Sequence, residues 1–353
     1  MDPGSGGMTM PHTMTKPPRL SIVIPTPADT AALEETLVSV LENRPDDCEI
    51  VVPLGCEYAD PWNIAEEVRF VQAPAGSSLV GCINLGIASS RGEVISILAA
   101  GWRATEGWAD RPLEHFDAGD VGAVIPLEVA ADDHDRVLSA GIRYGQGGRR
   151  IAVTAGGRHR AVDVPTRAAA APVAPALEAG FWRADVLELA GPGFSTVCGD
   201  TCADADMAVA LTRSGYVAVV EPTSRVVPGA TPRQRRVPFL SGLQAERLFW
   251  RSLAGQPVLW SLLLHGVEIV RHAVARAPFG TLPMLAGRAV GILQFGSYLP
   301  RYRQLRALMA QAATATDASA AEDGRTIRFD AGHAVAAGPR RRTAPPDSLR
   351  RSA

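Results

Sequence analysis

The amino-acid sequence predicts an α/β fold, with a mixed, mainly parallel sheet, flanking helices and a helical C-terminal extension. Two observations predict it: short apolar runs of strand length recur along the first two thirds of the chain, and segments with apolar residues at helical spacing separate them. Because the runs are apolar throughout, the strands are expected to be buried on both faces. The expected strands are 20–24, 50–52, 68–71, 94–98, 121–125 and 216–221.

The first strand and the helix after it have clear boundary signals. The apolar run stops at Pro25-Thr26-Pro27, and Asp29 or Thr30 can cap the helix that follows. In an α/β sheet, ligands bind beyond the carboxyl ends of the strands, so we expect the chemistry at 25–29, 53–56 and 99–103. Further helices are expected at 77–90, 181–189 and 204–214.

Residues 130–175 are less regular and carry a group of basic side chains. Gly145 to Gly148 indicate a hairpin or a mobile loop. Guanidinium groups fit phosphate oxygens, so the arginines beside this turn can pair with a diphosphate, although a solvated loop is favoured over that role. They are Arg149, Arg150, Arg158 and Arg160.

Composition excludes some classes of function. The chain has 353 residues and a net charge of −2, which gives no electrostatic case for nucleic acid as a partner. Five cysteines and no secretory apolar segment indicate reduced thiols in the cytoplasm. Cys198 and Cys202 are one helical turn apart, but no matching His/Cys pair accompanies them, so we expect no zinc site.

Four segments are predicted along the chain. Residues 1–18 and 311–353 have the composition of a disordered leader and tail. Residues 19–236 form the α/β domain, and 237–310 are an apolar, arginine-dotted helical extension.

The helical extension raises the question of a membrane. Residues 279–299 are long enough to span a bilayer, but Pro283 and Arg288 interrupt them. We therefore expect helices that lie on the inner membrane face, or that pack on the α/β domain, with basic residues before them meeting anionic headgroups. The basic residues are Arg233, Arg235 and Arg236. His265 and His272, two turns apart, are expected to serve packing.

Several motifs, in order, resemble the family 2 glycosyltransferases, which have a GT-A fold. The match covers about residues 19–230 and lies in the order and spacing of the motifs rather than in one of them. The matching segments are 20–26 (LSIVIPT), 34–41 (EETLVSVL), 84–88 (NLGIA), 91–95 (RGEVI), 181–185 (FWRAD) with Gly193-Phe194, and 204–211 (DADMAVAL) with Ser214-Gly215-Tyr216.

The resemblance implies an inverting hexosyl transfer from a nucleotide-sugar donor to a glycan or lipid-linked acceptor, in cell-surface polysaccharide synthesis. Asp204 takes the position of the family's general base. The resemblance places Pro25, Thr26, Asn84, Ala100 and Gly101 at the nucleotide-sugar site. For each of these positions a structural role is the alternative, which for Asp204 is the N-cap of the helix that follows.

The sequence departs from the family where oxygen ligands are needed. Ala99-Ala100-Gly101 stands in place of the Asp-x-Asp metal motif, and Pro53-Leu54 in place of two aspartates. The family uses Mg²⁺ or Mn²⁺, but alanine and glycine supply no side-chain oxygen, so we expect no tight metal site here.

Two alternatives to this degenerate enzyme stay open. One is a non-catalytic GT-A domain that binds a ligand or partner, and a weaker one is a nucleotidyltransferase-like enzyme. Carboxylates converging beside Ala99 to Gly101 would favour the enzyme. The candidates are Asp29, Asp60, Glu106, Asp110, Asp200 and Asp204.

Overall fold

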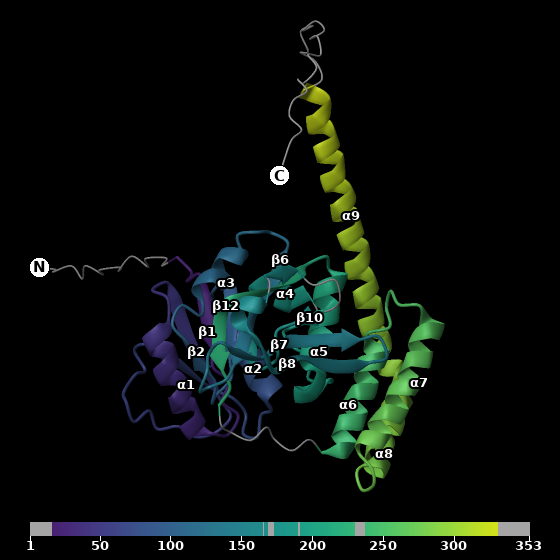
Figure 1. Ribbon diagram of the computed structural model, residues 1–353, viewed down its shortest axis with the longest axis horizontal. Coiled ribbons are helices and arrows are strands. Elements are labelled where there is room, and N and C mark those ends of the chain that lie inside the picture. Colours follow the sequence, from purple (N-terminus) through teal and green to yellow (C-terminus); the bar gives the residue numbers. More distant parts are fainter. Residues whose placement is uncertain (1–15, 165, 169–172, 190, 230–236, 331–353) are drawn as a thin grey trace, which may run out of the picture. The chain divides into compact units, whose positions relative to one another are not determined.

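The computed structural model describes residues 16–164, 166–168, 173–189, 191–229 and 237–330 (Figure 1). The chain divides into two units, Met1–Ala310 and Gln311–Ala353. The predicted leader falls largely on residues outside the described part, as do Arg233, Arg235 and Arg236.

The first half of the sheet is parallel. β1 (Leu20–Val23) lies between β2 (Cys48–Leu54) and β4 (Val94–Leu98), and β3 (Val68–Gln72) pairs with β2. All four are strands that the sequence predicted, and β1 and β4 are buried along their whole length. The connections are α1 (Thr30–Asn43) and α2 (Leu79–Ser89). The Asp29 carboxylate caps α1 by accepting a hydrogen bond of 3.0 Å from the Ala32 N–H, as predicted.

The second half of the sheet is mixed. β11 (Ala179–Arg183) runs antiparallel between β4 and β6 (Val121–Val129), and β12 (Val217–Val227) runs parallel to β6. The prediction of a helix over 181–189 is wrong for its first part, since α4 covers only Ala184–Leu189. Phe181 and Trp182 are fully buried in the middle of the sheet, and this pairing outweighs the local helical pattern.

A hairpin after β6 extends the sheet, since β7 pairs antiparallel with β6. β7 (Arg136–Gly145) and β8 (Arg149–Arg160) pair antiparallel, as the glycines at 145–148 indicated. Gly148 has a φ of +84°, the left-handed conformation that the turn requires. The remaining short elements are β5 (Arg103–Ala104), α3 (Asp110–His115), η1 (Ala161–Asp163), β9 (Arg167–Ala168) and β10 (Val173–Ala174).

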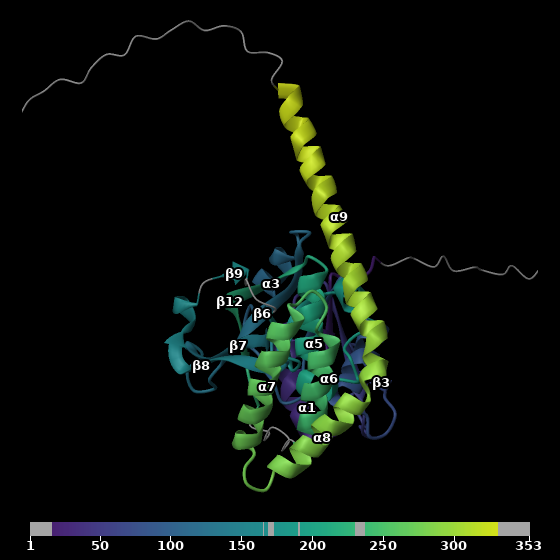
Figure 2. The same ribbon diagram turned by 90° about the vertical axis from the view of Figure 1, so that its right-hand side faces the viewer.

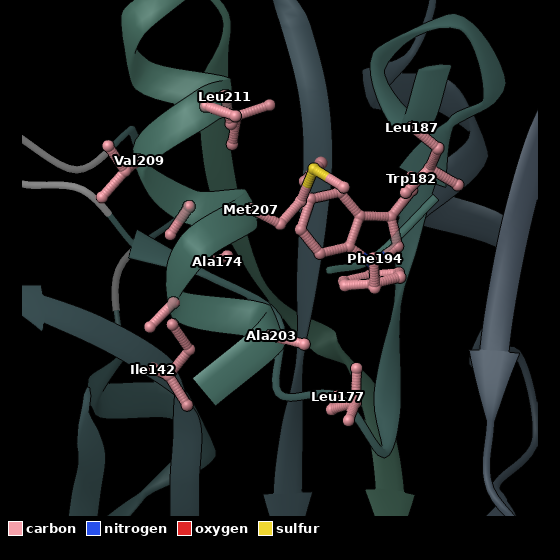
Figure 3. Packing of buried hydrophobic residues seen from close by; sticks show 14 of the residues in the cluster. Ile142, Ala174, Leu177, Trp182, Leu187, Phe194, Ala203, Met207, Val209 and Leu211 are labelled. Atoms are coloured by element: carbon pink, nitrogen blue, oxygen red, sulfur yellow. The ribbon is translucent and has the colours of Figure 1, made fainter. Parts of the chain in front are cut away.

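The main core lies between the sheet and α5 (Gly199–Arg213). In Figure 3, Met207 of α5 lies beside the indole of Trp182, which meets Phe194 edge-on with ring centroids 5.4 Å apart. Cys198 is the N-cap of α5, so Asp204 lies inside the helix. The alternative that Asp204 caps a helix beginning there is therefore wrong, because the helix starts one turn earlier.

The C-terminal part of the described chain is helical. Figure 1 shows α6 between α5 and the outer helix α7, and in Figure 2 the side that carries α7 faces the viewer. Within unit Met1–Ala310 the helices are α6 (Pro238–Arg251), α7 (Val258–Ala275), α8 (Thr281–Leu293), η2 (Phe295–Tyr298) and the start of α9 (Leu299–Asp330). α9 continues past residue 311, where the sequence predicted a disordered tail, because alanine-rich composition also favours helix.

A buried ion triad joins α5, α6 and the start of α9. The Asp206 carboxylate of α5 accepts hydrogen bonds from Arg251 Nε of α6 at 3.0 Å and from Arg301 Nη2 of α9 at 2.6 Å. Burial alone would raise the pKa of Asp206, but the charges of Arg301 and Arg251 outweigh burial and lower it. The triad therefore fixes α6 and the start of α9 on the α/β domain.

Candidate functional site

The predicted site residues of the first half meet at the carboxyl ends of β1, β2 and β4. The Ala100 N–H donates to the Pro25 carbonyl at 3.3 Å, and the Thr26 N–H donates to the Pro53 carbonyl at 2.9 Å. The Gly101 N–H donates to Thr36 Oγ1 at 2.9 Å. Topology thus brings Pro25, Thr26, Ala100 and Gly101 together, and their role in holding a nucleotide-sugar stays a prediction.

The segment after β12 closes over this edge. A Cβ on Gly229 would overlap the carbonyl oxygen of Gly101, so the two backbones are in direct contact. Gly101 has a φ of +92°, which favours glycine, so both positions need a residue without a side chain.

A cavity of about 330 Å³ opens beside this contact. Trp102 forms one wall, and three charged residues, Glu128, Arg150 and Glu178, line it with backbone and apolar groups. The other lining residues are Leu138, Ser139, Gly141, Ile142, Ala152, Ala176, Pro228 and Gly229. An aromatic wall beside carboxylates suits a polyhydroxylated ligand such as a sugar.

Glu178 is the carboxylate beside the position of the missing metal motif. In the antiparallel pairing of β11 with β4, Ala179 lies opposite Leu98, and the Ala99 N–H donates to the Glu178 carbonyl at 2.8 Å. Its Oε2 is buried and has no hydrogen-bond partner among the described residues. The sequence pattern does not single out Glu178, because residues 181–189 read as a helix rather than as the strand that the structure has at Ala179–Arg183. A strand assignment for 179–183 would have placed Glu178 at the end of the sheet.

Asp204 lies behind Arg150 rather than in the cavity. Arg150 Nε donates to both carboxylate oxygens at 2.9 Å, and its Nη2 donates to Oδ2 at 2.6 Å. The Leu177 N–H also donates to Oδ2, at 3.2 Å. Only 1% of the Asp204 side chain is exposed. Its role as general base stays a prediction, and in this arrangement an acceptor hydroxyl reaches the carboxylate only after Arg150 moves.

The pairing also sets the state of Arg150. Burial alone would lower the pKa of the guanidinium, but the charge and hydrogen bonds of Asp204, and then the charge of Glu178, raise it. Arg150 is therefore a permanent cation on the cavity wall. It binds the Asp204 carboxylate and lies near that of Glu178, whose Oε2 has no partner among the described residues.

We expect Arg150→Lys to lower the free energy of unfolding by about 1.5–3 kcal/mol, because lysine keeps the charge but loses the planar fork on a buried carboxylate. Urea denaturation measures the change. The matched control is Arg136→Lys, whose partner Asp132 is 77% exposed, where we expect less than about 1 kcal/mol. Equal effects at the two positions would contradict the assignment of Arg150 as a buried anchor.

The other predicted polar residues have structural partners. The Asn84 amide donates to the Phe194 carbonyl and accepts from the Phe194 N–H, both at 2.8 Å. Asp200 caps α2 by accepting from the Leu79 and Val80 N–H groups. None of Asn84, Asp29, Asp60, Asp110, Asp200 and Asp204 lines the cavity, and Glu106 lines a different one.

The residues present do not fit a divalent cation. Among the described residues, no group of three or more His, Cys, Asp or Glu side chains can hold a metal ion. The Cys198 and Cys202 thiols are buried, and burial raises the pKa of Cys198, which disfavours the thiolate that zinc needs.

Of the other hairpin arginines, Arg149 pairs with Glu268 and Arg160 with Asp135. The Arg158 side chain lies outside the described part.

Comparison with solved structures identifies the class of fold. The S. aureus TarS 1–349 structure aligns with a TM-score of 0.53 and 9% identity, covering 84% of this chain and 92% of that one. GalNAc-T7 with UDP, GalNAc and Mn²⁺ aligns with a TM-score of 0.51 and 14% identity, covering 79% of this chain and 56% of that one. At these identities the likeness shows the fold alone.

A third structure is mannosyltransferase PcManGT from Pyrobaculum calidifontis, in complex with GDP-Man and Mn²⁺. It shares 18% identity, covers 85% of this chain and 88% of that one, and has a TM-score of 0.47, too low to carry an argument. No family model and no curated protein sequence matches the chain. The protein has a GT-A-like α/β fold, which confirms the predicted fold class.

Proposed function

We propose that the protein is a family 2-like glycosyltransferase that moves a hexosyl group from a nucleotide-sugar to a glycan or lipid-linked acceptor. The observation that carries the proposal is the cavity at the carboxyl ends of the strands, which Glu178 lines and where its buried Oε2 has no hydrogen-bond partner among the described residues. GalNAc-T7, which shares the fold, was solved with UDP and GalNAc, and this supports a nucleotide-sugar as donor. Cell-surface polysaccharide synthesis in the cytoplasm, at the inner membrane face, is the setting that we propose.

The proposed reaction is a single displacement with inversion. The acceptor hydroxyl oxygen forms a bond to the anomeric carbon, and the bond from that carbon to the diphosphate breaks, with its electron pair leaving on the nucleoside diphosphate. The hydroxyl proton passes to a carboxylate, and Glu178 is the better placed of the two candidates because it lines the cavity. Asp204 then acts as a positioning residue that orients Arg150 and the backbone of Leu177.

Donor binding tests the proposal. A thermal-shift screen of UDP- and GDP-sugars with the full chain is expected to raise the melting temperature for at least one donor, since a ligand that binds the native state stabilises it. Release of nucleoside diphosphate with an added glycan or lipid acceptor would then establish transfer. A donor that binds without release would favour a non-catalytic GT-A domain, and no binding at all would contradict both.

We expect the donor-induced shift to be the same in Mn²⁺ and in EDTA, because Ala99, Ala100 and Gly101 offer no side-chain oxygen to a cation. Titration calorimetry with MnCl₂ alone should show no tight binding. A shift that needs Mn²⁺ would contradict this prediction and would point to ligands supplied by the donor itself.

A further inference from the structure

α7 is an amphipathic helix whose polar face lies against the protein and whose apolar face is exposed. At helical spacing, its inner face carries Ser261, His265, Glu268 and His272, of which Ser261 and His265 are buried. Its outer face carries large apolar side chains, and Leu259 is 85% exposed. The other outer residues are Leu262, Leu263, Val267, Val270 and Val274. A surface helix of a soluble domain shows the reverse pattern, so this apolar face needs an apolar surrounding.

The polar residues on the inner side are satisfied within the protein. His265 Nε2 lies 3.1 Å from the buried Glu246 carboxylate, and His265 Nδ1 lies 2.8 Å from the Gly147 carbonyl oxygen. Arg288 Nη1 of α8 and Trp250 Nε1 of α6 each donate to Glu246 at 2.8 Å. This network attaches α7 along its side to α6 and α8, which fits a helix that lies against an apolar medium.

α8 and the connection before it extend the same surface. Met284, Gly287, Arg288 and Gly291 face inward, while Leu282, Leu285, Ile292 and Leu293 face outward. Phe279, in the α7–α8 connection, is 93% exposed. We call this surface, made of the outward residues of α7 and α8 with Phe279, the outer apolar face.

The charge of the helical extension indicates which kind of partner covers the outer apolar face. Residues 237–310 carry eight arginines and two glutamates, with no lysine or aspartate, although the whole chain has a net charge of −2. Both glutamates are already engaged, Glu246 with Arg288 and Glu268 with Arg271. Arg251 and Arg301 pair with Asp206 of α5, and this single carboxylate offsets only part of their charge, so the region keeps an excess of basic side chains. A second copy of the chain would oppose like charges, whereas an anionic phospholipid surface would attract the basic residues near it.

We propose that the outer apolar face docks on an anionic phospholipid bilayer, with α7 lying in the interface rather than crossing it. Among the described helices, α7 is long and apolar enough to span a membrane, and it is only 11% buried. His265 of α7 binds Glu246 of α6, which also binds Arg288 of α8, so moving α7 across the bilayer would break these contacts. The proposal does not depend on the proposed catalytic role.

Vesicle co-sedimentation of the full chain tests the surface. We expect binding to vesicles of phosphatidylcholine mixed with phosphatidylglycerol, weaker binding to phosphatidylcholine alone, and weakening with salt. The variant Leu259→Ser/Leu263→Ser/Phe279→Ser should bind roughly 10²-fold or more weakly, since each large apolar side chain that enters lipid contributes about tenfold or more. The control Trp62→Ser/Val162→Ser removes exposed apolar side chains elsewhere and should bind as the wild type does.

Three outcomes would overturn the assignment of the outer apolar face to a bilayer, and a fourth would overturn the interfacial placement of α7. The first is vesicle binding that survives the triple substitution, and the second is the absence of vesicle binding by the wild type. The third is a wild-type dimer that the triple substitution dissociates, which would assign the face to a second copy. Unchanged circular dichroism shows that the variants are folded. Carbonate should release the bound protein, and retention until detergent is added would mean that α7 spans the bilayer.

Discussion

Replacing Asp206 with asparagine is expected to lower the free energy of unfolding by about 3–5 kcal/mol, because it removes the buried carboxylate that the Arg251 and Arg301 guanidinium groups share. The side chains of Asp206 and Arg301 are 4% and 3% exposed. Asparagine keeps the shape, so the loss reports charge rather than packing. Asp132→Asn, at the exposed pair with Arg136, is the matched control, for which we expect a much smaller loss because solvent screens the pair. Urea denaturation compares the two.

The same triad predicts a dependence on pH. The pKa of Asp206 is lowered in the folded protein, so the folded state binds fewer protons than the unfolded chain does at low pH. The stabilisation by Asp206 is therefore fully present above the unfolded pKa of about 3.9 and is lost as pH falls toward the folded pKa. The difference between wild type and Asp206→Asn should accordingly shrink below about pH 4. A difference that stays constant in acid would contradict a charged Asp206.

Local pattern predicted the parallel half of the sheet well and the mixed half less well. β1 and β4 are short apolar runs bounded by polar or turn-forming residues, so their apolar composition and length suffice to predict them as buried strands. β11 is a strand because β4 and β6 pair with it on either side, and neither partner is visible in the local sequence. The start of α5 was missed for a similar reason, since Cys198 and Gly199 carry no strong capping signal.

In the candidate site too, some positions follow from local sequence and others depend on pairing with distant segments. The meeting of Pro25 with Ala100 follows from the rule that carboxyl ends of parallel strands share one edge. The positions of Glu178 and Arg150 follow from antiparallel register and from a hairpin folding back on α5, which sequence spacing does not reveal. Resemblance singled out Asp204, but the side chain that binds it lies 54 residues earlier in the chain.

In the helical extension, the sequence alone does not show which way a charged side chain points. On sequence grounds Arg288 disfavours a membrane-spanning segment, because a charge is costly in lipid. In the structure, Arg288 faces inward to Glu246 and leaves the outward side of α8 apolar. The charge therefore does not argue against lipid contact, and the inward network argues for a helix that lies along the surface.

Glu178→Gln is expected to lower the rate of sugar transfer by about 10²–10⁴-fold, the usual loss when a general base is removed. Glutamine keeps the shape of the side chain but cannot accept the acceptor's proton. Within the described part of the chain, the Glu178 carboxylate makes no hydrogen bond that holds the fold, whereas its backbone carbonyl accepts from the Ala99 N–H, so the melting temperature and the donor-induced shift should be unchanged. Initial rates of nucleoside diphosphate release give the measurement. Glu106→Gln, an exposed carboxylate in the other cavity, is the control.

Asp204→Asn distinguishes the two carboxylates. If Asp204 positions Arg150, Asp204→Asn should lower the free energy of unfolding and should lower the rate of transfer less than Glu178→Gln does. If Asp204 is the base, Asp204→Asn should lower the rate by about 10²–10⁴-fold while Glu178→Gln leaves the rate unchanged. That result would restore the assignment made from sequence, and it would require Arg150 to swing away from Asp204 when the acceptor binds.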